Sequence, residues 1–78
     1  MLYNVLMPGE GNVDSGVVTK WLVGEGDEVF EGDYLCEIES SKTSFGIESP
    51  VSGVVKQILC QEGDETPAMQ TIAVIEQQ

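Results

Sequence analysis

The stretch SGVVTKWLVGEGDE at residues 15–28 decides the fold, because a close copy of it, SGVVKQILCQEGDE, occupies residues 52–65. When residues 15–40 are laid on residues 52–77 without a gap, 11 of 26 positions are identical. Repetition at this level indicates that one supersecondary unit is used twice. Because one such unit cannot bury its apolar face alone, we expect the two copies to pack against each other.

The secondary-structure pattern is that of an all-β chain. Short runs of β-branched and aromatic residues alternate with turns rich in Gly, Asp and Pro, and no window keeps a helical period. The predicted strands are residues 2–7, 15–23, 28–30, 34–39, 44–48, 52–60 and 71–76. We therefore predict a single domain, residues 1–78, in which two sheets related by a quasi-two-fold axis form a flattened barrel or sandwich.

Glycines fall at matching places in the two copies. Gly26 and Gly63 lie in the repeated Glu-Gly-Asp turn, where we expect a positive φ, since glycine adopts it without a Cβ penalty. Gly16 and Gly53 stand at the start of the two matching strands. A glycine inside a strand marks a bulge or a close approach of another backbone, and we expect one of these at both positions.

The link between the two copies, residues 41–51, contains Lys42, one of three lysines in the chain. We expect this link to project away from the two units, with Lys42 at the tip of a hairpin. Its sequence neighbours are Ser41 and Thr43, so no carboxylate is adjacent to it. The other two lysines, Lys20 and Lys56, fall inside predicted strands and are interpreted as surface residues.

Composition excludes several classes of function. The net charge of −11, from 14 acidic residues and three lysines, disfavours binding to nucleic acid or to an anionic membrane surface. The absence of histidine removes the commonest general base and metal ligand, and 78 residues leave little room for a catalytic cleft beside a core. No apolar run approaches the ~20 residues of a membrane span, and we expect no signal or transit peptide.

The two cysteines, Cys36 and Cys60, lack a CxxC spacing and do not form a disulfide framework. Both alternate with apolar residues, Cys36 with Tyr34 and Ile38, and we predict buried free thiols. Such thiols favour a reducing compartment.

A series of short motifs runs through the chain: VLMP at 5–8, GVV at 16–18, WL at 21–22, EGD at 25–27, EGD at 31–33, LCEIE at 35–39, SPVSGVV at 49–55 and EGD at 62–64. Together they resemble the biotinyl/lipoyl attachment domain family over nearly the whole chain. The resemblance is greatest to the lipoyl domain of acyltransferase components of 2-oxo acid dehydrogenase complexes. It implies a flattened β-barrel of two four-stranded antiparallel sheets.

The resemblance also implies covalent lipoate on Lys42. The lysine stands in Asp-Lys-Ala in the lipoyl branch and in Met-Lys-Met in the biotinyl branch, whereas here it stands in Ser41-Lys42-Thr43. The missing methionines argue more strongly against biotin than the missing aspartate argues against lipoate. Biotin on Lys42 stays open as the alternative.

Further positions match the lipoyl branch. Glu39, three residues before the lysine, matches an acidic position favoured in lipoyl acceptors, and Gly26 and Gly53 fall where that branch has glycines on either side of the lysine. The predicted recognition residues for the modifying enzyme are Glu39, Ser41, Thr43, Gly26 and Gly53. The resemblance implies no catalytic residue and no metal ligand.

As a family member the chain is expected to be a non-catalytic, swinging-arm carrier within a dihydrolipoamide acyltransferase. It would move acyl groups and reducing equivalents between the active sites of a 2-oxo acid dehydrogenase complex. The implied partners are a lipoyl ligase or transferase, a 2-oxo acid decarboxylase, the acyltransferase core and dihydrolipoamide dehydrogenase. We expect a monomeric isolated domain in the cytoplasm, or in the mitochondrial matrix of a eukaryote after processing.

Two other functions stay open at this point. One is a biotin carrier domain of a carboxylase, and the other is an unmodified lipoyl-like structural module such as those of efflux adaptor proteins. The resemblance also implies that loop 8–14 lies beside the hairpin tip and helps a cognate decarboxylase to recognise the domain.

Overall fold

The structure, a computed structural model, describes residues 1–9 and 14–78, which form eight strands and no helix. The strands are β1 (Leu2–Leu6), β2 (Ser15–Trp21), β3 (Glu28–Val29), β4 (Tyr34–Glu39), β5 (Ser44–Glu48), β6 (Gly53–Ile58), β7 (Glu65–Pro67) and β8 (Thr71–Gln77). The described residues therefore include no helix that could cross a lipid bilayer. The predicted all-β class is confirmed.

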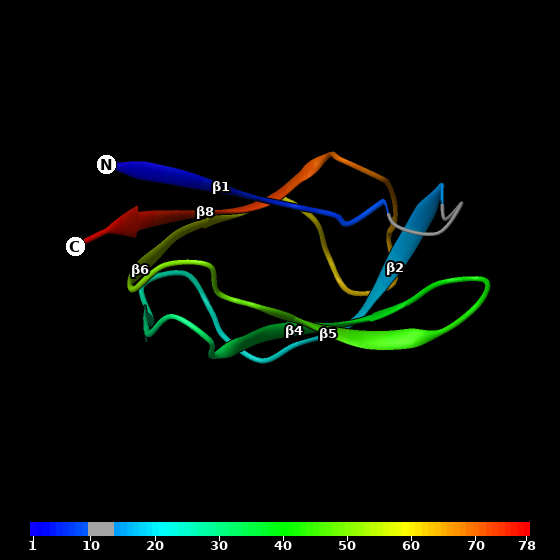
Figure 1. Cartoon of the computed structure of the whole chain (residues 1–78), viewed down its shortest axis with the longest axis horizontal. Helices are drawn as coiled ribbons and strands as arrows, with labels where there is room; N and C mark the ends of the chain where they lie inside the picture. The colour runs from blue at the N-terminus through cyan, green and yellow to red at the C-terminus, as the bar shows by residue number, and fades with distance from the viewer. Residues whose placement is uncertain (10–13) are drawn as a thin grey trace.

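The strands form two four-stranded antiparallel sheets, with the orders β1-β8-β6-β3 and β5-β4-β2-β7. Exchanging β1 with β5, β2 with β6, β3 with β7 and β4 with β8 converts one order into the other. For β2, β3 and β4 this exchange follows the sequence repeat, and the matching strand orders confirm the predicted quasi-two-fold arrangement. Figure 1 shows the two sheets as layers along the 34 Å long axis.

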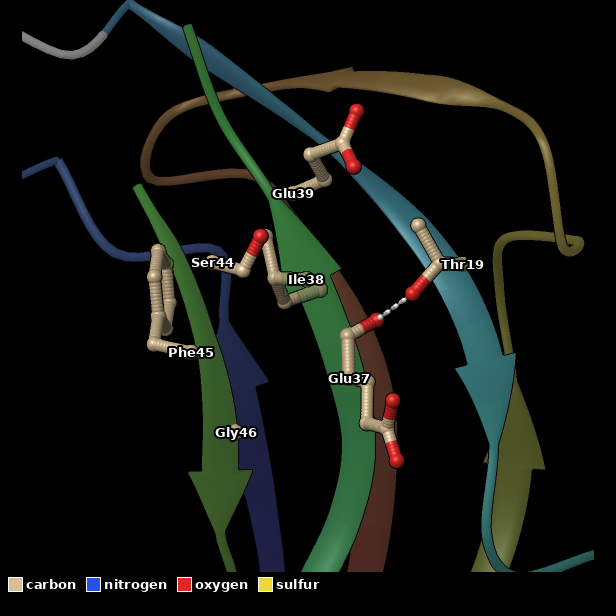
Figure 2. Close-up of a pocket in the computed structure, with 7 residues that line it drawn as sticks. All are labelled: Thr19, Glu37, Ile38, Glu39, Ser44, Phe45 and Gly46. Atoms are coloured by element: carbon tan, nitrogen blue, oxygen red, sulfur yellow. Dashed lines mark hydrogen bonds between the residues drawn. The ribbon is translucent and has the colours of Figure 1, made fainter. Parts of the chain in front are cut away.

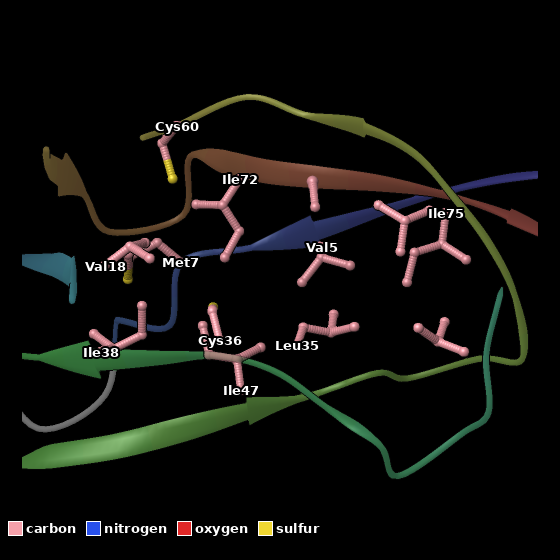
Figure 3. Close-up of a cluster of buried hydrophobic side chains, with 13 residues drawn as sticks. Val5, Met7, Val18, Leu35, Cys36, Ile38, Ile47, Cys60, Ile72 and Ile75 are labelled. Atoms are coloured by element: carbon pink, nitrogen blue, oxygen red, sulfur yellow. The ribbon is translucent and has the colours of Figure 1, made fainter. Parts of the chain in front are cut away.

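The core lies between the two sheets, where Figure 3 shows apolar side chains from both layers pointing toward one another. Alternation along each strand sends every second residue inward. The buried hydrophobic residues are Val5, Met7, Val18, Val29, Leu35, Cys36, Ile38, Ile47, Val55, Cys60, Ile72, Ala73 and Ile75. Most of these residues come from the two copies of the repeat, and both copies contribute, so neither copy could bury its apolar face alone.

The first Glu-Gly-Asp turn is bonded to the second copy of the repeat. Gly26, with φ +92°, donates its N–H to the carbonyl of Val55 at 2.7 Å, and the carboxylate of Glu25 accepts from the N–H of Ile58 at 2.9 Å. These two bonds flank the register shift between Val55 and Gln57. The turn thus supplies partners to the backbone near a bulge, where the regular ladder is interrupted.

The matching Glu-Gly-Asp turn of the other copy, residues 62–64, makes the same bonds in the opposite direction. Gly63, with φ +90°, donates to the carbonyl of Val18 at 2.8 Å, and the carboxylate of Glu62 accepts from the N–H of Trp21 at 2.8 Å. The repeated motif therefore joins the two copies by reciprocal hydrogen bonds. The predicted positive φ of both turn glycines is confirmed.

Gly16 and Gly53 mark close approaches and not bulges, since the register shifts lie further along β2 and β6. A Cβ on Gly53 would overlap the carbonyl oxygen of Glu76, and one on Gly16 would meet Ile38 Cγ2 at 2.8 Å and Met7 Sδ at 3.0 Å. The predicted close approach of another backbone is therefore found at Gly53, whereas at Gly16 the approaching atoms belong to side chains.

The strand predicted at residues 44–48 is confirmed as β5, which pairs along β4. Of the link 41–51, which was expected to project as a whole, only the first residues therefore project. Strand β7 was not predicted, although the repeat maps residues 28–30 onto it. It has three residues and one buried side chain, Thr66, which is too little for a visible alternation.

Tyr34 alternates with Cys36 in the sequence but does not share its burial. It is 57% exposed, while Leu35 and Cys36 are both buried. The pairing of β4 with β5 shifts register between Tyr34 and Cys36, and such a shift changes the face on which a side chain lies. The Tyr34 ring instead lies over Gly46, where an added Cβ would meet it at 2.7 Å.

We predict that Met69→Gly stabilises the protein. Met69 has φ +70° at the place where the other copy has Gly32 with φ +94°, and its side chain is exposed. The left-handed conformation costs a non-glycine residue about 1–2 kcal/mol, partly offset by the ~0.4–1 kcal/mol that glycine adds to unfolded-state entropy. Urea unfolding should show a gain of up to about 1 kcal/mol, whereas Gly32→Ala should show a loss. A lower urea midpoint for Met69→Gly than for the wild type would contradict the strain assigned to the backbone of Met69.

We predict that Gly53→Ala destabilises more than Gly16→Ala, although the repeat makes the two positions equivalent. The methyl group added at position 53 would overlap backbone atoms, which cannot move without disturbing the strand pairing. The methyl group added at position 16 would meet the ends of side chains, which can change their rotamers. We expect about 1–3 kcal/mol for Gly16→Ala, a typical overpacking cost, and a larger loss for Gly53→Ala. Thermal unfolding of both variants measures the two losses of stability, and equal losses would contradict the prediction.

Candidate functional site

The β4–β5 hairpin carries the candidate site at its tip. Glu39 pairs with Ser44 as the last pair of the ladder, and Ser40 donates its N–H to the carbonyl of Thr43 at 2.8 Å. Figure 1 shows the tip at one end of the molecule and both chain termini at the other. Ser41 and Lys42 therefore lie at the end of the molecule opposite the termini.

The structure brings four of the predicted site residues together in this hairpin. Ser41, Lys42 and Thr43 are exposed at the tip, and Glu39 is exposed at the end of β4. Lys20 and Lys56 are exposed within β2 and β6, as expected for surface residues, and Lys56 Nζ lies 3.5 Å from a carboxylate oxygen of Glu76. Of the three lysines, Lys42 alone is at a turn.

Gly26 and Gly53 are not brought to the tip. Gly53 pairs with Gln77, whose N–H donates to the carbonyl of Met1, so it lies at the end that holds the termini. Gly26 bonds to β6 two residues further along. The repeat glycine on the hairpin side is Gly16, which contacts Ile38.

A comparison with known protein families identifies the family to which the chain is related. The biotin/lipoyl family model, described as biotin-requiring enzyme, matches residues 4–75. The chain belongs to the biotin/lipoyl attachment family. The resemblance predicted from the motifs is therefore confirmed.

Curated relatives in this family are named dihydrolipoyllysine-residue acetyltransferase components of pyruvate dehydrogenase complexes. The protein from Zymomonas mobilis is 42% identical over 77 residues, which cover 96% of this chain and 18% of the relative. One from Staphylococcus aureus is 39% identical over 67 residues, covering 86% and 14%. The mitochondrial protein from Caenorhabditis elegans is 45% identical over 53 residues, covering 68% and 10%. The chain spans less than a fifth of the length of these relatives.

Beside the tip, this biotin/lipoyl family member has an open groove of about 450 Å³ along β2, β4 and β5. Figure 2 shows its lining residues, Thr19, Glu37, Ile38, Glu39, Ser44, Phe45 and Gly46. Thr19 donates its hydroxyl to the carbonyl of Glu37 at 3.2 Å, which joins β2 to β4 at the groove floor. Of these residues, only Glu39 was predicted. The spacing of Glu37 and Glu39, two apart in a predicted strand, could have indicated one acidic face.

The loop 8–14 was expected beside the tip, but its residues 10–13 lie outside the described residues.

Both cysteines of the family member are buried free thiols, as predicted. Burial raises the pKa of the Cys36 thiol from 9.0 to about 12, and the nearby Cys60 adds to the effect. Burial also raises the pKa of Cys60, opposed by a hydrogen bond with Thr66. Since the thiolate is the nucleophile, these two groups are inert at neutral pH and belong to the core.

We predict a loss of stability in alkali that depends on Cys36. Its pKa is higher in the folded state, so its stabilisation is fully present below about pH 9 and is lost as the pH rises toward about 12. The slope is at most about 1.4 kcal/mol for each pH unit. Urea unfolding from about pH 8 to about pH 11 should show a steeper decline for the wild type than for Cys36→Ala. Equal slopes would contradict the prediction.

Proposed function

We propose that the chain is a lipoyl carrier domain with lipoate joined by an amide bond to Lys42. The observation that carries the proposal is the position of Lys42, exposed at the tip of a hairpin in a member of an attachment family. The names of the relatives favour lipoate over biotin. Ser41 and Thr43 stand where the biotinyl branch has methionines, and this difference also favours lipoate over biotin.

The residues at the tip fit an amide-linked arm. The hydrogen bonds described for the turn join main-chain atoms and the Ser40 hydroxyl, so acylation of Lys42 Nζ leaves them in place. We keep Glu39, Ser41 and Thr43 as recognition residues for the modifying enzyme. Gly26 and Gly53, at the other end, contribute to recognition through the fold that they permit.

When bound, lipoate supplies a dithiolane that accepts an acyl group together with two electrons and passes them on. The domain's own part is to hold Lys42 on a rigid hairpin and to keep it away from the core. Tethering raises the effective concentration of the cargo at each partner's active site. The exposed carboxylates of Glu37 and Glu39 beside the tip help to steer it toward basic partner surfaces.

By analogy with the relatives, we infer a role within the acyltransferase component of a 2-oxo acid dehydrogenase complex that acts on pyruvate. The partners are then a lipoyl ligase or transferase, the decarboxylase, the acyltransferase core and dihydrolipoamide dehydrogenase. The domain itself carries out no chemical step, and as an isolated domain we expect a monomer. Its compartment is that of the complex, the cytoplasm or the mitochondrial matrix.

The proposal predicts a single lipoyl adduct on Lys42. The domain is incubated with a lipoyl ligase, ATP and lipoate, and the adduct is located by intact mass and peptide mapping. Lys42→Arg should abolish the adduct. Lys56→Arg, which also alters an exposed lysine, should leave it unchanged.

A parallel incubation with biotin ligase and biotin, followed by streptavidin blotting, tests the alternative cargo. Modification by biotin ligase alone would replace lipoate with biotin in the proposal. An adduct on Lys20 or Lys56, or no adduct in either reaction, would overturn the assignment of Lys42.

A further inference from the structure

The hairpin that carries Lys42 closes in an unusual way. Its two-residue loop, Ser41-Lys42, would ordinarily need residues with φ > 0, which is why Gly and Asn dominate such loops. Among the described non-glycine residues, Met69 is the one with a positive φ, so neither loop residue meets this requirement. Besides the main-chain bond from the Ser40 N–H to the Thr43 carbonyl, a further interaction holds the turn.

That interaction comes from the side chain of Ser40. Its hydroxyl oxygen accepts from the N–H of Thr43 at 3.2 Å and from the N–H of Lys42 at a longer 3.4 Å, and the hydroxyl donates to the carbonyl of Thr43 at 2.9 Å. A serine hydroxyl that accepts from amides two and three residues ahead mimics a backbone turn. Ser40 therefore supplies the acceptor that the main chain would provide in a regular two-residue hairpin.

The surroundings of Ser40 set it apart from its neighbours. It is half-buried at the base of the loop, whereas Ser41, Lys42 and Thr43 are exposed. Its hydrogen bonds within the described part of the chain join it to residues of the turn, at the end of the molecule opposite the termini. Loss of its hydroxyl should change the conformation of the loop and leave the packing between the sheets intact.

We propose that Ser40 is a positioning residue for modification of Lys42: its hydroxyl fixes the backbone of the loop so that the lysine is presented to the modifying enzyme in one conformation. This inference rests on the proposed function and names the residue on which presentation depends. Fixing a reacting group in advance removes an entropic cost from the encounter.

The test compares Ser40→Ala with Ser40→Thr, which keeps the hydroxyl, and with Ser41→Ala, a matched removal of a hydroxyl next to Lys42. The first readout needs no ligase: amide hydrogen exchange at Lys42 and Thr43, followed by NMR on the unmodified domain. Ser40→Ala should exchange several-fold faster at both amides. Ser40→Thr and Ser41→Ala should stay close to the wild type, and the melting temperature of Ser40→Ala should fall by no more than about 10 °C, as expected for the loss of one hydrogen bond.

The second readout is the kinetics of lipoyl attachment by the ligase. One hydrogen bond of ordinary strength corresponds to a roughly two- to ten-fold change, which we expect as a lower kcat/KM for Ser40→Ala, restored in Ser40→Thr. Equal rates for Ser40→Ala and the wild type, or a defect in Ser40→Thr as large as that in Ser40→Ala, would overturn the role of Ser40. A wild type that takes no adduct would instead overturn the proposed function, and this inference with it.

Discussion

The structure depends on the reciprocal hydrogen bonds between the two copies of the repeat. The two matching Glu-Gly-Asp turns, 25–27 and 62–64, each bond to the other copy beside a register shift, through a glycine amide and a glutamate carboxylate. Neither sheet is complete without the other copy, because β3 lies on β6 and β7 lies on β2. The folded unit is therefore the pair, which explains why the same three residues are kept in both turns.

The repeat, the all-β class and the two-sheet arrangement could be predicted because they depend on patterns that extend over many residues. The details that failed depend on single residues. A register shift turned Tyr34 outward while Cys36 stayed in the core, and β7 was too short to show alternation. Pairing shifts arise from contacts with a neighbouring strand, and no local pattern in residues 34–39 encodes them.

The predictions for the candidate site also divide into those that succeeded and those that failed. Lys42, Glu39, Ser41 and Thr43 could be placed from the sequence, because a hairpin brings residues near in sequence together in space. Gly26 and Gly53 could not, since spacing along the chain gives no distance across a folded domain, and the structure puts them at the far end. Ser40 was missed because serine is common in turns. Its importance follows from the lack of a positive φ in the loop.

Both termini leave the molecule at the end opposite Lys42. A polypeptide joined to either terminus would therefore hold the domain by its base, with the 34 Å long axis pointing outward. The domain then acts as a rigid spacer, and its own length adds to the radius within which a group on the lysine can move. A lysine near the termini would reach only as far as its side chain and the flexible chain beside it.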